Sequence, residues 1–243
     1  NKLFDKYKFD LVILSHCQEY SYASFAWIAT LRKIPVYVLY GEFGTNRFLY
    51  LKNRKDLFAY PSRPTLGELN KISEDLKKGL IKEGKNLISL RFKGKTNDVG
   101  SKYAYINRTK KINKRQICKI NNWDFQKPLI AVYCSNWFDY PHSSGLKSYI
   151  DFKDWIDSIL NLASNNKSVN WLFKSHPCDD IYPSLKGQTI AEAIAFYNLE
   201  HISLASRDWN GLDIIKSVDG ITTCHGTIGI EATLLGKPVL VPY

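Results

Sequence analysis

Short continuous apolar runs alternate along the chain with segments in which apolar residues recur every three or four positions. Continuous runs are typical of strands buried in a parallel sheet, and the wider spacing is typical of helices that pack against one. The first runs cover residues 10–15 and 34–40, with helical spacing at residues 21–31 between them. This order predicts a βαβ unit, and residues 66–80 predict a further helix.

The composition shifts between residues 91 and 122, where Lys, Arg, Asn, Thr and Gly dominate and apolar residues are scattered. We interpret this stretch as a solvated basic connector. The alternative is a basic flap over a phosphate-bearing ligand. The connector divides the chain into a first half, residues 1–110, and a second half, residues 111–243.

A second series of alternating strands and helices follows the connector. Strands are predicted at 128–134, 169–173, 201–204, 220–223 and 238–241, and helices at 149–162, 189–197, 212–217 and 231–235. The predicted fold class is therefore α/β, with two halves. The chain has no initiating Met and stops at Tyr243, directly after a core strand. We therefore expect an internal piece of a longer protein, with a fold that is incomplete at both ends.

The chain is basic, with 34 Lys and Arg against 23 Asp and Glu and a net charge of +11. This balance suits a face toward anionic substrates, nucleic acid or an acidic membrane, although a lysine-rich composition also explains it. No zinc finger, RNA-recognition motif or basic heptad helix is present, so we expect no nucleic-acid partner. Five cysteines without a CxxC pair, and no long apolar run or signal peptide, indicate a cytosolic protein.

The most informative segment lies at the carboxyl end of the chain, where a strand, a turn of small residues, a helix and a strand follow one another. Gly226, Thr227 and Gly229 keep the turn small and place backbone N–H groups at a helix start, where phosphate binds readily. Close packing alone explains the glycines. It does not explain the hydrogen-bonding groups of Thr223 and His225 beside them.

A second phosphate-binding element closes the strand at 169–173. Lys174 and His176 follow this strand, and Pro177 fixes the turn so that the imidazole is aimed outward. A lone histidine there is also explained by hydrogen bonds to neighbouring backbone. Two anion-binding turns at the carboxyl ends of strands in one sheet predict a nucleotide or sugar-phosphate cleft. Glu231 is either favoured by the helix dipole or accepts hydrogen bonds from ribose or sugar hydroxyls.

Candidate acid–base groups lie in two loops. Asp139 and His142 flank a proline in a loop after a strand, and Glu42 lies in the turn after residues 34–40. Each has an ordinary alternative: a backbone cap for Asp139, a surface position for His142 and a plain turn for Glu42. We name all three as catalytic candidates, although for the Asp139 loop we favour substrate binding. No His cluster or DxD pair is present, so we predict no metal site and no cofactor.

Three motifs resemble the second half of a GT-B glycosyltransferase, namely residues 174–177, 223–231 and 236–239. The similarity is to bacterial surface and capsular polysaccharide transferases. Those proteins, like bacterial sialyltransferases and β-Kdo transferases, carry an HP motif and a later Ser/Thr motif around the donor nucleotide. The resemblance covers residues 125–243 well and residues 9–50 loosely.

The resemblance implies a metal-independent glycosyltransferase with two Rossmann-like halves, the first on the acceptor side and the second on the nucleotide-sugar donor side. It would move a sugar to a growing surface polysaccharide or glycolipid. His176 and Thr227 would contact the donor phosphates, and Glu231 the ribose or sugar. His225-Gly-Thr227 stands where relatives carry a Ser-Ser pair, which leaves the donor open among CMP, UDP, GDP and CDP sugars. The implied enzyme is cytoplasmic, and peripheral contact with the inner membrane stays open.

The candidate residues divide into two roles, stabilisation of the leaving phosphate and activation of the acceptor. Lys174, His176 and the helix start after Gly226 would stabilise the charge that grows on the leaving phosphate without a metal. Asp139 or Glu42 would activate the acceptor hydroxyl as a general base.

Two alternatives stay open. A sugar-nucleotide epimerase of the same fold would need further acid–base carboxylates, which the sequence does not reveal. A non-catalytic module that binds nucleic acid or a membrane surface would also account for the basic charge. Binding of free CMP, UDP or GDP would separate the enzymes from the module.

Overall fold

The computed structural model describes residues 2–17, 20–40, 47–58, 66–96, 101–137, 148–180, 182 and 184–242. These residues form two compact units, unit 1 up to Leu69 and unit 2 from Asn70 onward. Both units combine helices with a sheet, which confirms the predicted α/β class. Among the described residues, no helix combines the length and the apolar character that crossing a bilayer requires.

Unit 1 is built on a sheet of three strands in chain order, β1 (Val12–Leu14), β2 (Val36–Tyr40) and β3 (Arg47–Leu51). β1 and β2 pair in parallel, and α2 (Tyr20–Leu31) connects them, which confirms the predicted βαβ unit. β3 pairs antiparallel to β2, a strand that the hydrophobic pattern does not predict.

The core of unit 1 lies between α2 and one face of its sheet. Ala26 and Ala29 of α2 are fully buried, and these small side chains let the helix lie close to Val36 of β2. Unit 1 also contains two short helices, α1 (Lys2–Lys6) and η2 (Arg54–Phe58), and all but the last residue of α3 (Leu66–Asn70).

Unit 2 is built on a parallel sheet of five strands in the order β6-β5-β4-β7-β8. Its strands are β4 (Leu129–Tyr133), β5 (Asn170–Lys174), β6 (Ile202–Leu204), β7 (Gly220–Thr223) and β8 (Val239–Leu240). Counted within the unit this order is 3-2-1-4-5, the strand order of a Rossmann sheet. The direction of winding reverses between β4 and β7.

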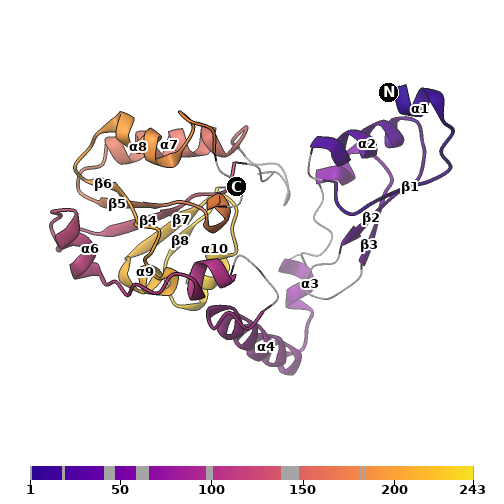
Figure 1. Ribbon diagram of the computed structural model, residues 1–243. Helices are drawn as coiled ribbons and strands as arrows, with labels where there is room; N and C mark the ends of the chain where they lie inside the picture. Colours follow the sequence, from indigo (N-terminus) through magenta and orange to yellow (C-terminus); the bar gives the residue numbers. More distant parts are fainter. Residues whose placement is uncertain are drawn as a thin grey trace. The chain divides into compact units, whose positions relative to one another are not determined.

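Helices cover both faces of this sheet (Figure 1). α7 (Phe152–Ser164) and α8 (Ile190–Tyr197) lie on one face. α6 (Lys114–Ile120), α9 (Gly211–Ser217) and α10 (Ile228–Leu234) lie on the other. The central strands β4 and β5 are buried on both faces, so they are nearly continuous apolar runs rather than alternating ones.

Successive residues of one strand feed the two cores. In β5, Trp171 and Phe173 pack on the side of α7 and α8, while Leu172 packs with Ile214 and Ile215 of α9. The strands and helices predicted for the second half are therefore confirmed, each within a few residues of its expected bounds.

Side-chain caps set the starts of several helices in unit 2. The side chain of Asn113, before α6, accepts a hydrogen bond from the backbone N–H of Gln116, and the Gln116 side chain accepts one from the backbone N–H of Asn113. Thr189, before α8, makes the same reciprocal pair with Glu192. Asp151 caps α7 in the simpler one-way manner. Such caps satisfy backbone N–H groups that a helix start leaves without partners.

The segment 66–80 differs from the single helix that its spacing predicts. It contains α3 (Leu66–Asn70) and the start of a longer helix, α4 (Glu74–Phe92). Ser73 separates the two, because its hydroxyl accepts a hydrogen bond from the N–H of Leu76 and so begins α4 there.

The expectation of a solvated connector at residues 91–122 is wrong. This segment contains η3 (Lys102–Ile106) and α6, and it buries Tyr105, Ile112 and Ile117 in the core beside α9. Its apolar residues look scattered because η3 and α6 have only 5 and 7 residues, which is too short to show a clear helical period. The compact units accordingly divide near residue 70, and the boundary predicted at 110 falls inside unit 2.

Two leucines of α7 test this core. Leu160 is 0% exposed and Leu162 is 49% exposed, so the same substitution samples both sides of one helix. Leu160→Ala should lower the free energy of unfolding by about 2–5 kcal/mol because it leaves a cavity. Leu162→Ala, the matched control, should change it by less than about 1 kcal/mol. Urea unfolding followed by tryptophan fluorescence measures both, and equal losses would contradict the placement of α7.

Candidate functional site

The candidate site is the carboxyl edge of the unit 2 sheet, where the loops after β4, β5 and β7 meet. The hydroxyl of Ser135, after β4, donates to the backbone oxygen of His225, after β7, at 3.4 Å. The amide of Asn136 donates to Asp179 Oδ1 at 3.0 Å, in the short helix η4 (Pro177–Asp180) after β5. In a Rossmann sheet, ligands bind outside the carboxyl ends of the strands at the point where the strand order reverses.

Both motifs predicted to bind phosphate lie at this edge. β5 and β7 are the two neighbours of β4, so Lys174 and His176 follow one flanking strand and the turn at 224–227 follows the other. The expectation of two turns at the carboxyl ends of one sheet is therefore confirmed. The individual roles of these residues stay predictions.

Lys174, the last residue of β5, is the electrostatic centre of the site. It is 2% exposed, and its Nζ has no hydrogen-bond partner among the described residues. Burial, together with the charges of Arg108 and Arg207, lowers the pKa of Lys174 to about 7. A charged ammonium that is buried without a partner costs free energy. The side chain therefore favours its neutral amine form unless an anion binds beside it.

Neighbouring strands also end in buried polar atoms without partners in the part of the chain that the structure describes. They are the Tyr133 hydroxyl on β4 and, one residue before the end of β7 and on the opposite face, the Thr222 hydroxyl. Tyr133 is the register partner of Lys174, so the two side chains leave the sheet on the same face. Most buried polar groups in proteins are hydrogen-bonded, and the neighbouring exceptions at Lys174 and Tyr133 point to a ligand on that face of the sheet edge.

His176 is held in one tautomer by its own turn. The backbone N–H of Cys178 donates to its Nδ1 at 3.2 Å, which leaves the ring proton of the neutral form on Nε2. Burial and then the charges of Arg108 and Lys174 lower the pKa of His176, against the opposing effect of Asp179. The ring is therefore a neutral donor near pH 7, with Nε2–H as its free donor group.

The turn after β7 is packed tightly, as the simpler explanation of its glycines requires. A Cβ at Gly226 would lie 3.2 Å from the Thr223 hydroxyl and 3.3 Å from Ile228, closer than ordinary contacts. Thr223 is buried beneath it, while Gly226 and Thr227 are exposed at the edge. α10, which follows, has seven residues.

Glu231 lies in the first turn of α10 but is occupied by protein groups. Its side chain is 3% exposed, and Oε1 accepts from Arg91 Nε at 2.8 Å. The Tyr105 hydroxyl donates to Oε2. Burial first, and then Glu231, raise the pKa of Tyr105 well above its usual range, so the phenol keeps its proton and remains a donor.

Segment 105–110 forms a strap along the edge of the sheet, within the stretch for which a basic flap over a phosphate-bearing ligand is the alternative expectation from the sequence. The amide of Asn210, which caps α9, donates to the backbone oxygens of Tyr105 and Arg108, each at 3.0 Å. This strap brings the buried Arg108 to the vicinity of Lys174. No local pattern could reveal it, because Arg108 and Asn210 are 102 positions apart.

The three catalytic candidates, Glu42, Asp139 and His142, lie outside the described residues, so their roles stay predictions. Across the described ranges, no three His, Cys, Asp or Glu side chains are grouped so that they could hold a metal ion.

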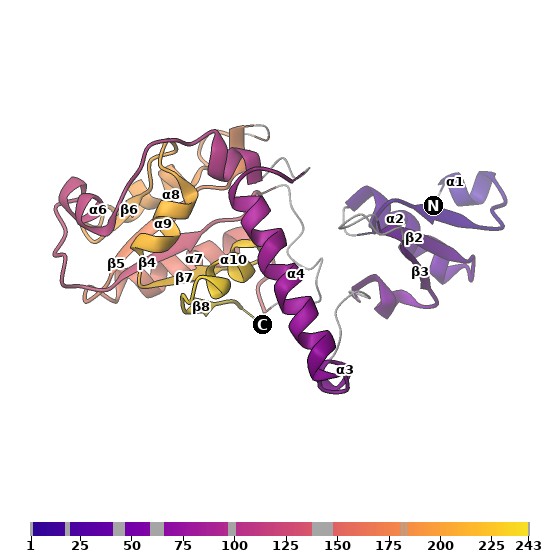
Figure 2. The same cartoon turned by 90° about the horizontal axis from the view of Figure 1, so that it is seen from below.

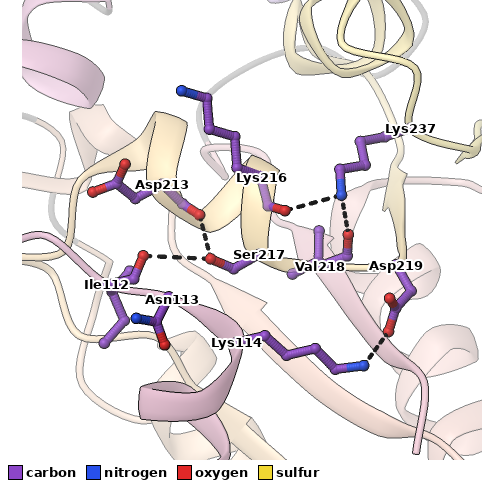
Figure 3. Close-up of a pocket in the computed structure, with 9 residues that line it drawn as sticks. All are labelled: Ile112, Asn113, Lys114, Asp213, Lys216, Ser217, Val218, Asp219 and Lys237. Atoms are coloured by element: carbon purple, nitrogen blue, oxygen red, sulfur yellow. Dashed lines mark hydrogen bonds and ion pairs between the residues drawn. The ribbon is translucent and has the colours of Figure 1, made fainter.

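A pocket of about 450 Å³ lies at the opposite, amino edge of the same sheet (Figure 3). Figure 3 shows that two of its lysines, Lys114 and Lys237, are turned toward protein partners. Lys114 pairs with Asp219 at 2.8 Å, and Lys237 donates to the backbone oxygen of Val218 at 2.6 Å. Because parallel sheets of this kind bind ligands at the other edge, we do not assign the pocket a function.

Residues 144–242 match a family model described as "Capsule polysaccharide biosynthesis protein". The resemblance to capsule polysaccharide biosynthesis proteins is confirmed for this segment. The matched segment runs from before α7 to β8 and contains Lys174, His176, the turn at 224–227 and Glu231. Comparison with curated protein sequences finds no match.

Two solved structures, both of KpsC from Thermosulfurimonas dismutans, are similar to the chain at low identity. The one described as a beta Kdo 2,4 transferase is 13% identical, with 94% of this chain and 67% of that chain covered and a TM-score of 0.48. The other, a beta Kdo 2,7 transferase, is 16% identical, with coverages of 99% and 67% and a TM-score of 0.45. Both TM-scores are low, so neither likeness carries an argument about this chain.

The pKa of Lys174 predicts a specific dependence of stability on pH. Between about 7 and the ordinary value of 10.5, the unfolded chain holds the Lys174 proton and the folded chain does not. Stability must therefore rise with pH across this window, by up to about 1.4 kcal/mol per pH unit for one group. Below the window the amine is charged in both states and its burial penalty applies in full.

The free energy of unfolding of the wild type minus that of Lys174→Met gives the contribution of this one group. The difference should shift in favour of the wild type as the pH rises, and at lower pH the variant should be the more stable protein. Urea unfolding at about pH 6 and about pH 9 measures it, with the exposed Lys216→Met as the matched control. A flat difference would mean that Lys174 keeps its ordinary pKa.

Proposed function

We propose that this chain is a glycosyltransferase of capsule polysaccharide biosynthesis, with its nucleotide-sugar donor bound at the carboxyl edge of the unit 2 sheet. The acceptor is a growing polysaccharide or glycolipid. The enzyme works in the cytoplasm, with peripheral contact at the inner membrane where the acceptor is a lipid. The match of residues 144–242 to a capsule biosynthesis family supports the process.

The single observation that carries the proposal is the unpartnered ammonium of Lys174. It is buried at a strand end, with Arg108 and Arg207 near it and the Nε2–H donor of His176 two residues further along the chain. A diphosphate or phosphodiester supplies the negative charge that this cluster lacks. Arg and Lys side chains in a water-poor site form strong charge-assisted hydrogen bonds to phosphate.

Transfer of a sugar leaves negative charge on the departing nucleotide phosphate. Fixed donors aimed at that phosphate lower the barrier because they need no reorganisation as the charge grows. Lys174 supplies a full charge once it takes up a proton, and His176 supplies a neutral N–H. We propose that these groups do the work without a divalent metal ion.

Acceptor activation requires a general base, and Asp139 and Glu42 remain our candidates, with His142 beside Asp139. Thr223, His225, Gly226 and Thr227 would shape the nucleotide end of the donor site. Two other readings compete: an epimerase acting on a sugar nucleotide, and a non-catalytic module that binds nucleic acid or a membrane surface.

Nucleotide binding tests the proposal directly. CMP, UDP and GDP are added to the chain in turn, and a ligand present at about a hundred times its Kd should stabilise the fold by about 2.7 kcal/mol. Lys174→Met and His176→Ala should each weaken the binding at least tenfold and cut transfer by roughly 10²–10³, because each removes a charge-stabilising donor. Lys216→Met, at the opposite edge of the sheet, should leave both unchanged.

Other outcomes of this experiment separate the alternatives. Absence of any nucleotide shift, together with salt-sensitive binding of RNA or anionic vesicles, would replace the enzyme with a binding module. Binding of a nucleotide sugar that is converted to its epimer without an acceptor would assign the epimerase.

Metal independence is tested separately. Transfer should continue at an unchanged rate in excess EDTA, because the proposed leaving-group contacts are Lys174 and His176 rather than a metal ion. Loss of activity in EDTA, with recovery on addition of Mg²⁺ or Mn²⁺, would show that this account of the leaving phosphate is wrong.

A further inference from the structure

The contacts of Arg91 join two parts of unit 2 that are far apart in the chain. Arg91 lies in the last turn of α4, which passes beside α10 (Figure 2). Its Nε donates to Glu231 at 2.8 Å, and its Nη2 donates to the Thr227 hydroxyl at 3.3 Å. The partners are 140 and 136 positions away, on the two sides of the start of α10. One guanidinium therefore bridges the exposed turn and the buried first turn of the helix.

The carboxylate that Arg91 contacts is fixed from its other side. The Tyr105 hydroxyl donates to the second oxygen of Glu231. Tyr105 is itself held by the Asn210 amide on its backbone oxygen, at 3.0 Å, and by Phe92, whose ring meets its ring edge to face at 5.0 Å. Arg91 and Phe92 thus reach the two members of the Tyr105–Glu231 pair from one end of α4.

Polar contacts matter here because apolar burial contributes little to the attachment of α4. None of its residues is buried, although Phe92 packs in part against the core beside α9. Arg91, in contrast, has a side chain that is only 13% exposed, and its partner Glu231 is 3% exposed. Each oxygen of Glu231 accepts a hydrogen bond, and Arg91 donates through Nε and Nη2, so the buried pair and the Thr227 hydroxyl are held in one arrangement.

We propose that Arg91 is a positioning residue of the donor site, which fixes the turn at 224–227 through Thr227 and uses Glu231 as its buried counter-ion. Glu231 then acts through Arg91 and Tyr105 and does not touch the donor, in contrast to the role expected from the sequence. This inference rests on the proposed function for its consequence, nucleotide affinity, but the geometry of the turn can be measured without any nucleotide.

The planar guanidinium is essential to this arrangement. Arginine presents several N–H groups in a fixed fork, so it can hold Glu231 and Thr227 at once. A lysine keeps the charge but offers a single point of attachment, so it would retain the pair with Glu231 and lose the bridge. Arg91→Lys is therefore the informative variant, because it separates pairing from positioning.

Hydrogen–deuterium exchange of the full chain tests the proposal. In Arg91→Met, amides of residues 224–231 should exchange at least tenfold faster, while those of β5 and α7 keep their wild-type rates. Arg91→Lys should give the same local effect in smaller degree. Arg115→Met, an exposed arginine on α6, is the matched control and should leave the turn unchanged. Faster exchange throughout unit 2 would reduce Arg91 to a general stability role and overturn the proposal.

Nucleotide affinity is measured on the same variants by calorimetry with CMP, UDP and GDP. Arg91→Met should weaken binding roughly tenfold, equivalent to about 1.4 kcal/mol. Glu231→Gln should match it in both affinity and local exchange, and the double variant should be no worse than either single one. Weaker binding in Glu231→Gln with an unchanged turn would mean that Glu231 touches the nucleotide, which would overturn the proposal.

Hydrogen–deuterium exchange tests the positioning role of Arg91, and calorimetry tests nucleotide binding, so the two hypotheses can fail separately. If no nucleotide binds the wild type, the proposed function fails, while the exchange data still decide whether Arg91 fixes the turn. If nucleotide binds the wild type and Arg91→Met changes neither its affinity nor the exchange of the turn, the positioning role fails alone.

Discussion

The parallel pairing of β4 with β5 on one side and β7 on the other is the constraint on which the rest of unit 2 depends. It sets the two faces that the helices cover, and it reverses the winding of the chain at β4. Connections on the two sides then leave the sheet in opposite directions, so the loops after β4, β5 and β7 meet at one edge of the sheet. The described residues that we assign to the donor site lie at the ends of these strands, in the loops that follow, or in segments that pack against them.

The hydrophobic pattern was sufficient for the strands of this sheet and most helices on it, because both faces are buried and each element has a plain period. It also located the two motifs at strand ends. The pattern failed where structure is made by single long-range contacts. The strap at 105–110 has no period, and its attachment to Asn210 depends on side chains that no local rule brings together.

Glu231 illustrates the same limit within the site. Its position in the first turn of a helix was visible in the sequence, and a role in ligand binding was a reasonable expectation. What the sequence could not reveal is that Arg91 and Tyr105 surround it, because they come from segments that read as the end of a surface helix and a connector. The identity of a residue was predictable here, whereas its partners were not.

Two buried charges in this unit are treated in opposite ways. Glu231 has a partner on each oxygen, and the pair contributes a defined geometry. Lys174 has none among the described residues, and we expect its burial to lower the stability of the fold at neutral and acidic pH. Sites that bind a charged ligand commonly contain a buried residue that lowers the stability of the fold. Arg91, Tyr105 and Glu231 therefore fix the shape of the site, whereas Lys174 is the group that we propose binds the ligand.

The separation of the paired strands also has a consequence for the synthesis of this protein. Ser135 and His225, which join the loops after β4 and β7, are 90 positions apart. At the usual 5–20 residues per second, the ribosome needs roughly 5–18 s to add that stretch. Throughout this interval β4 has emerged without the neighbour that will close its second edge, and an open apolar strand edge is prone to association. The nascent chain therefore depends on early pairing of β4 with β5, and on shielding of the other edge, until β7 arrives.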